Sequence, residues 1–160
     1  MRTRQHFEQK LDEIHEHLYR IGTMIEHALS NAMKAVHDHD ADLAQSVIQG
    51  DLAINQAVRE VHDRVLLLIA TQHPAAGDLR FVSVVLTLLP ELERMGDHAA
   101  SICKLQRRMM AEPSYQPLQA LPGQFSTMIV ETGQRALSIL QAGVEALRSR
   151  DRSFAERVVG

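Results

Sequence analysis

The chain has 160 residues, which is enough for one domain, or for one domain and part of another. Hydrophobic residues make up 45% of it, yet aromatic residues make up only 4% and Trp is absent, a composition that favours close-packed helices over a β-sheet. The net charge of −3 excludes a strongly basic protein, so we expect neither nucleic acid nor an anionic membrane surface as a partner. No apolar run is long enough to span a bilayer, no signal peptide is recognised, and the single Cys fits a reducing compartment, so we expect a soluble cytoplasmic protein.

A first long helix is predicted from about residue 5 to residue 38. Its apolar positions recur in steps of three and four, at Leu11, Ile14, Leu18, Ile21, Ile25, Ala28, Ala32 and Ala35. Asp40 follows as the expected N-cap of a second helix. The second helix has the same spacing, at Ala44, Val47, Asp51, Ile54, Val58, Val61, Val65 and Leu68.

A third helix is predicted to begin at Pro74, because proline is favoured in the first turn of a helix, and to end near Ala111. Pro90 lies inside this helix, where we expect a kink. Three long helices joined by short turns indicate an all-α protein, with an antiparallel three-helix bundle at residues 1–112.

Beyond the bundle, the chain begins the same pattern again. Residues 113–117 contain two prolines without helical periodicity and are expected to form a linker. Adding 111 to positions in the first helix and its following turn gives identities in one register: Gly22 with Gly133, Leu29 with Leu140, Ala35 with Ala146, Asp40 with Asp151, Ala44 with Ala155 and Val47 with Val158. We therefore interpret residues 118–160 as an incomplete second repeat, with its first helix and the start of the next.

The fourth predicted helix carries an apolar face whose partner helices are missing from the chain. This face consists of Ile129, Ala136, Leu140 and Leu147. Such a face is expected to be buried, either on the first bundle or in a second subunit, and we expect a homodimer.

Two acidic residues four positions apart mark the third helix. Glu93 and Asp97 lie on one helix face, about 6 Å apart at Cβ, so they can share one cation. Asp51 occupies an apolar-stripe position of the second helix. With the turn near residue 72 or 73, Asp51 and Glu93 each lie about 21 residues, or about 31 Å, from it and are expected at the same height. With Asn55, one turn after Asp51, they form a predicted patch of oxygen-bearing side chains.

This patch has two interpretations. The first is a metal site formed by Asp51, Asn55, Glu93 and Asp97. Oxygen ligands without Cys favour a divalent or trivalent ion such as iron, Mg²⁺, Mn²⁺, Ca²⁺ or Zn²⁺. The second is a bundle edge at which an arginine neutralises the carboxylates, the candidates being Arg59, Arg64 and Arg94. If these carboxylates were buried with neither a metal ion nor an arginine beside them, their burial would cost several kcal/mol or force one of them to take up a proton.

Two motifs carry a resemblance to a known family. The first is Gln72-x-Pro74-x-x-x-Asp78-Leu79-Arg80 followed by Leu92-Glu93-Arg94-Met95-Gly96-Asp97, and the second is Val47-Ile48-x-Gly50-Asp51-x-x-Ile54-Asn55. Together they resemble the PhoU family of phosphate-signalling proteins, over the whole chain. The resemblance implies two tandem three-helix bundles and, in some members, iron or another metal at surface Glu/Asp-x-x-x-Asp motifs. Glu93 and Asp97 match that motif, and Asp51 and Asn55 match positions of the family's second helix.

The resemblance also implies a cytoplasmic negative regulator of the phosphate regulon, an adaptor and not an enzyme. Its expected partners are the ATPase of the phosphate ABC transporter and a sensor histidine kinase. One departure is that the chain ends at Gly160, two residues before the counterpart of Asp51 in the second repeat, so a second acidic motif is missing. The alternatives are a metal-independent helical interaction module and, from another class, a metal-dependent enzyme or metal store.

Overall fold

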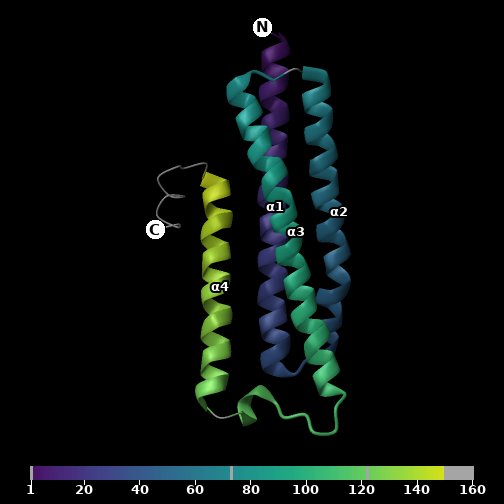
Figure 1. Ribbon diagram of the computed structural model, residues 1–160, viewed down its shortest axis with the longest axis vertical. Helices are drawn as coiled ribbons and strands as arrows, with labels where there is room; N and C mark the ends of the chain where they lie inside the picture. The colour runs from purple at the N-terminus through teal and green to yellow at the C-terminus, as the bar shows by residue number, and fades with distance from the viewer. Residues whose placement is uncertain (1, 73, 122, 150–160) are drawn as a thin grey trace.

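The computed structural model describes residues 2–72, 74–121 and 123–149. Its elements are α1 (Arg2–Asp38), α2 (Ala41–Gln72), α3 (Ala76–Met110), the short 3₁₀ helix η1 (Leu118–Ala120) and α4 (Gly123–Ser149). None of these residues forms a strand, and the predicted all-α fold class is confirmed. Helices α1, α2 and α3 form an antiparallel bundle, and α4 lies beside α1 (Figure 1). No helix in these ranges combines the length and the apolar character needed to cross a membrane.

The turn between α1 and α2 is closed by Asp40, the predicted N-cap. Its Oδ1 accepts a hydrogen bond from the backbone N–H of Leu43 at 2.8 Å. His39 precedes it with a φ of 55°, a left-handed conformation that reverses the chain direction. The Nδ1 atom of His39 also shares a 2.7 Å hydrogen bond with the hydroxyl of Tyr115. This bond ties the linker to the end of the bundle.

Helix α3 begins two residues later than predicted. Ala75 is its N-cap and has extended backbone, with a ψ of 167°, so Pro74 precedes the helix and does not lie in its first turn. Asp78 does lie in the first turn, where a negative charge interacts favourably with the helix dipole. The helix continues through Pro90 to Met110.

The core is formed by one apolar face from each of α1, α2 and α3. Its largest fully buried side chains are Ile14, Leu18, Ile21, Ile25, Val61, Val65, Val82, Val85, Leu89 and Cys103. Each large aliphatic side chain contributes roughly 1.5–3 kcal/mol by leaving water, so this layer dominates the stability of the bundle. Toward the linker end the core residues are smaller, with Ala32, Ala35, Ala44 and Ala99 buried together. Burial raises the pKa of the Cys103 thiol in this cluster to about 11, so the thiol stays protonated at neutral pH.

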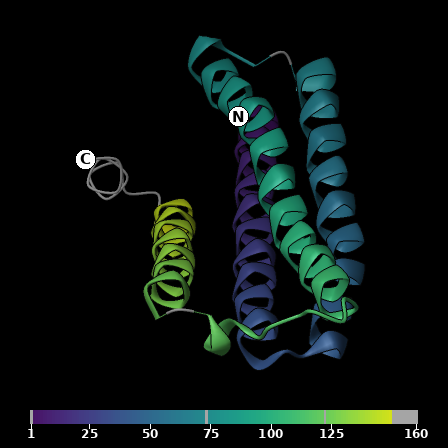
Figure 2. The ribbon, with the colours of Figure 1, turned by 60° about the horizontal axis from the view of Figure 1, so that its bottom comes forward.

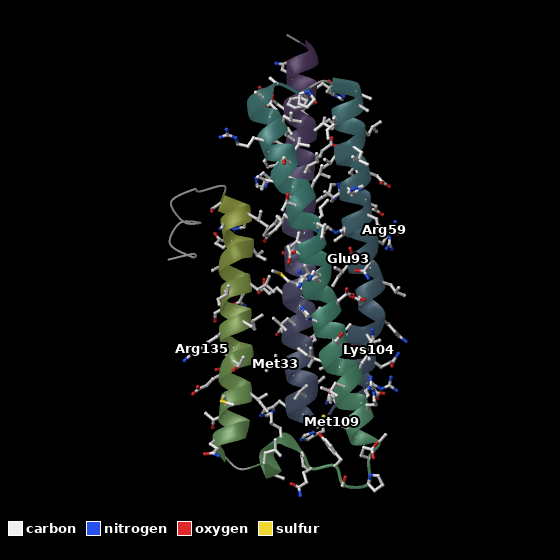
Figure 3. The ribbon with its side chains drawn as sticks, viewed as in Figure 1. Met33, Arg59, Glu93, Lys104, Met109 and Arg135 are labelled. Atoms are coloured by element: carbon white, nitrogen blue, oxygen red, sulfur yellow. The ribbon has the colours of Figure 1, made fainter. Side chains whose placement is uncertain are left out.

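Helix α4 packs along α1, antiparallel to it, and lies apart from α2 (Figures 1 and 2). The buried Val144 faces Gly22, where an added Cβ would lie 2.8 Å from Val144 Cγ2. Farther along the pair, Gly133 faces Met33, which lies between the two helices (Figure 3). Gln141 Nε2 donates a 2.9 Å hydrogen bond to Glu26 Oε1. The fourth helix therefore packs on the first bundle, which was one of the two expected outcomes.

The two glycine contacts are related by the 111-residue repeat. Adding 111 converts Gly22 into Gly133, and it converts Met33 into Val144. The two helices thus contact each other with exchanged roles, as in a pseudo-two-fold pair. The predicted start of the next helix, at residues 151–160, lies outside the described residues.

We expect Gly22→Leu to displace α4 while leaving the three-helix bundle folded. The new side chain would overlap Val144, and overpacking of this kind costs about 1–3 kcal/mol. Hydrogen exchange read by mass spectrometry should show faster exchange in α4 and little change in α2 and α3. Gly50→Leu is the control, because no atom lies within 4 Å of a Cβ at that position. Unchanged protection of α4 in Gly22→Leu would contradict the packing described above.

Candidate functional site

The four predicted site residues lie along the contact between α2 and α3. Asp51, Asn55 and Glu93 are half-buried, and Asp97 is exposed. Asn55 Nδ2 donates a 3.3 Å hydrogen bond to Asp51 Oδ2, so the two residues on α2 form a pair. Glu93 lies midway along α3 (Figure 3).

Gly96 allows α3 to approach α2 closely at this level. A Cβ at Gly96 would lie 3.3 Å from Asp51 Oδ1 and 3.1 Å from Ile54 Cγ2. Asp51 therefore lies against the backbone of α3, between the levels of Glu93 and Asp97. The sequence predicted that Asp51 lies level with Glu93. The structure instead places Asp51 about one helical turn farther along α3, beside Gly96. The difference arises because α2 ends at Gln72 and α3 begins at Ala76, which moves the centre of the turn to about residue 74.

The carboxylates at this level repel one another. Burial raises the pKa of Asp51, and the negative charges of Asp97 and, more weakly, Glu93 raise it further. The ammonium group of Lys104 and the hydrogen bond from Asn55 lower the pKa, but the net direction is upward. A cation placed here would reverse this shift and relieve the repulsion.

The arginines proposed as neutralising partners are engaged elsewhere or exposed. Arg94 Nη1 forms an ion pair with Glu91 at 3.2 Å, on the same helix. The charge of Arg64 acts on Glu13 and His17, and Arg59 lies exposed on α2 (Figure 3). The ion pairs of the described residues therefore join none of these arginines to the carboxylates of the patch.

Lys104 is the basic residue that sequence reasoning missed. It is the nearby positive charge that lowers the pKa of Asp51. The signal was present, because Lys104 follows Asp97 by seven residues, or two helical turns, and so lies on the same face of α3. His98, beside Asp97, lines a groove between α1, α3 and α4, away from the patch.

Two oxygen atoms of the patch are buried without a hydrogen-bond partner. They are Asp51 Oδ1 and Asn55 Oδ1. An unsatisfied buried polar atom costs about 1–3 kcal/mol, so these atoms are suited to accept a cation or a water molecule. Among the described residues, however, no three His, Cys, Asp or Glu side chains lie close enough together to hold a metal ion. The oxygen atoms of α2 are therefore in place, while Glu93 and Asp97 are not gathered around them.

The raised pKa of Asp51 predicts a specific pH dependence in protein kept free of metal with EDTA. Because the folded state raises this pKa above 3.8, the folded state favours the protonated form, and Asp51 destabilises the fold as pH rises through that window. Asp51→Asn, a neutral residue of similar shape, should therefore melt at a higher temperature than the wild type at pH 7. The difference should shrink toward pH 3.

Thermal melts followed by circular dichroism from pH 3 to pH 7 measure this effect. Asp63→Asn is the control, because Asp63 is an exposed aspartate on the same helix. A lower melting temperature for Asp51→Asn at pH 7, or a difference independent of pH, would show that the Asp51 charge does not oppose folding.

Comparison with known proteins agrees with this architecture. The PhoU domain model matches residues 18–106, which include the four patch residues. The phosphate-specific transport system accessory protein PhoU homolog of Clostridium acetobutylicum is 37% identical over 111 residues, covering 69% of this chain and 51% of that protein. The accessory protein PhoU of Escherichia coli (strain K12) is 31% identical over 152 residues, covering 95% of this chain and 60% of that protein.

The crystal structure of PhoU from Pseudomonas aeruginosa matches with a TM-score of 0.83 and 26% sequence identity. The match covers 94% of this chain and 69% of that one. The chain spans 51% and 60% of the length of the two relatives named above. Since the family model covers more than half of the chain and the bundle is the same, the chain belongs to the PhoU family.

Proposed function

We propose that the chain is an accessory regulator of phosphate uptake whose α2–α3 patch binds a metal ion. The regulatory role is supported by the names of its relatives, which are accessory proteins of a phosphate-specific transport system. The metal is supported by one observation above all. Asp51 Oδ1 and Asn55 Oδ1 are buried without hydrogen-bond partners beside the acidic pair of α3.

The patch has a fixed half and a half that can adjust. The fixed half is the hydrogen-bonded pair Asp51 and Asn55 on α2. The adjustable half is Glu93 and Asp97, which have long or exposed side chains on one face of α3. The four oxygen-bearing side chains suit a hard cation such as iron, Mg²⁺ or Mn²⁺. When bound, the ion would add positive charge to that of Lys104 and offset the remaining repulsion among the carboxylates.

A position near the surface favours a regulatory role for such an ion over a catalytic one. Asp97 is exposed and Glu93 is half-exposed, so an ion held here would change the charge of a surface that a partner can contact. The proposed partners are the ATPase of the phosphate transporter and a sensor histidine kinase, to which the protein would act as an adaptor in the cytoplasm. The second candidate is a metal-independent helical interaction module. The spacing of the acidic side chains favours it, since no three of them lie close together in the described residues.

We expect Glu93→Ala/Asp97→Ala to abolish metal binding while leaving the helices folded. The wild-type chain should bind iron or Mn²⁺, and EDTA should lower its melting temperature by about 5 °C or more, because a bound ion stabilises the folded state. The double variant should bind no metal and be insensitive to EDTA. In EDTA it should melt no lower than the wild type, since it has lost two mutually repelling charges.

Metal content by mass spectrometry and melting by circular dichroism provide these measurements. Asp12→Ala/Glu16→Ala is the matched control, because these residues also form an exposed acidic pair four positions apart, on α1. If no metal binds to the wild type and EDTA leaves its melting temperature unchanged, the patch is structural.

We also expect the chain to bind the purified transporter ATPase in a metal-dependent way. A bound metal ion would present a positive charge at the α2–α3 surface to an acidic group of the ATPase. EDTA removes that ion and Glu93→Ala/Asp97→Ala cannot hold it, so each should weaken binding about tenfold or more. Biolayer interferometry with the immobilised chain measures this, and Asp12→Ala/Glu16→Ala should bind as the wild type does. ATPase binding that is equally tight in EDTA would favour the metal-independent module, and no binding at all would refute the adaptor role toward this partner.

A further inference from the structure

A small pocket lies between α1 and α2, at the end of the bundle where α1 begins and α2 ends. Its volume is about 330 Å³, and it shares no lining residue with the carboxylate patch or with the groove that His98 lines. The lining residues of this α1–α2 pocket come from residues 6–14 of α1 and residues 64–72 of α2. At 1.5 Å per residue, each wall is about 12 Å long. The volume suits a small molecule, and the walls are too short for a partner helix to bury a standard interface.

The base of the α1–α2 pocket is apolar. Ile14 of α1 and Leu68 of α2 line it and are 2% and 4% exposed, so they belong to the core beneath it. Leu67 of α2 also lines it and is 64% exposed. An occupant that covered Leu67 would remove apolar surface from water, which is a main source of affinity in small-molecule sites.

The pocket also has one positive charge that is not paired. Lys10 Nζ donates hydrogen bonds to Glu13 Oε1 at 3.1 Å and to Glu13 Oε2 at 2.8 Å, so these two charges balance. Arg64 is exposed, and its charge acts on Glu13 and His17. Within the described ranges, the Arg64 side chain forms neither an ion pair nor a hydrogen bond. With histidine counted as neutral, the pocket therefore presents one net positive charge, although the whole chain has a net charge of −3.

The acidic neighbours of Arg64 on α2 have other partners. Gln56 Nε2 donates a 3.1 Å hydrogen bond to Glu60 Oε1, one turn before Arg64. The Oδ1 atom of Asp63 lies 3.6 Å from Nδ1 of His62. The guanidinium group of Arg64 is thus available to an anion from solution.

We propose that the α1–α2 pocket binds a small aliphatic carboxylate, with the carboxylate group on Arg64 and the apolar chain on Leu67 and Ile14. A guanidinium group presents paired N–H donors that match a carboxylate in bidentate geometry. A carboxylate carries one negative charge, which equals the net charge of the pocket. A doubly charged phosphate ester would instead keep an excess negative charge, which Glu13 repels. The inference does not depend on metal binding at the α2–α3 patch or on the transporter ATPase.

Calorimetric titration of the full chain with octanoate, in EDTA at neutral pH, tests the proposal. The wild type should bind octanoate with a Kd of about 1 mM or below. Arg64→Gln should weaken binding about tenfold or more, because it removes the charged donor pair. Arg59→Gln is the matched control, since Arg59 is an exposed arginine of α2 that does not line the pocket. Octanol and octylamine, which lack the carboxylate, should each bind about tenfold more weakly than octanoate.

A second pair of variants reports on the apolar part of the pocket. Leu67→Asp should weaken octanoate binding about tenfold or more, because it removes apolar contact and adds a repelling charge. Leu66→Asp should bind as the wild type does, since Leu66 is the neighbouring exposed leucine and does not line the pocket. Circular dichroism should show that all variants remain helical.

Three results would overturn the proposal. The first is a wild type that binds no octanoate at about 10 mM, ten times the expected Kd, or that binds it no better than Arg64→Gln does. The second is binding that Ile139→Asp abolishes and Arg64→Gln leaves intact, which would place octanoate in the groove between α1, α3 and α4. The third is displacement of octanoate by an equal concentration of inorganic phosphate, because the apolar base would then contribute nothing to recognition.

Discussion

Burial of the apolar face of α1 is the interaction on which every other part of this molecule depends. Helices α2 and α3 cover that face, and α4 packs on another side of the same helix, so α1 contacts every other helix. The large Ile, Leu and Val side chains at the centre of the bundle are replaced near the linker by the smaller Ala32, Ala35, Ala44 and Ala99.

The patch of Asp51, Asn55, Glu93 and Asp97 forms where α2 and α3 approach each other closely, at Gly96. A side chain at this position would contact Ile54 and the Asp51 carboxylate, so glycine brings Asp51 against the backbone of α3. This close approach lowers the stability of the fold while no cation is bound. Burial and the neighbouring acidic residues raise the pKa of Asp51, and two buried oxygen atoms have no partner. The large aliphatic core tolerates this local cost, because its stabilising contribution is far greater. A cation bound here would offset the repulsion between the carboxylates and contact the two unpartnered oxygen atoms. Cation binding would then stabilise the bundle, which is the basis of the regulation proposed above.

Helix α4 packs on α1 through contacts that follow the internal repeat. Its contacts with α1 exchange roles under the 111-residue offset, with Gly22 meeting Val144 and Gly133 meeting Met33. Glycine on each helix accommodates the larger side chain of the other, so the two helices approach closely at both places. Among the described residues, Ile129 and Ile139 of α4 are exposed, and Ile139 lines an apolar groove between α1, α3 and α4. The carboxylate patch and the groove therefore lie on separate surfaces, and one can be disrupted without the other.

The sequence by itself determined the helices and their antiparallel order, and it placed Asp51 near the acidic residues of α3. Periodicity is a local property, and the spacing of Leu18, Ile21 and Ile25 predicts a helix and its buried face without any tertiary information. The pairing of Asp51 with the acidic residues of α3 followed from helix rise and turn position. Only the tertiary structure decided the register between α2 and α3, because this register depends on where α2 ends and α3 begins. As a result, Asp51 lies at the level of Gly96 and not at the level of Glu93. It also decided that the charge of Lys104 acts on Asp51, and that α4 lies on α1. These outcomes depend on side-chain packing between segments far apart in the chain, which no local pattern encodes.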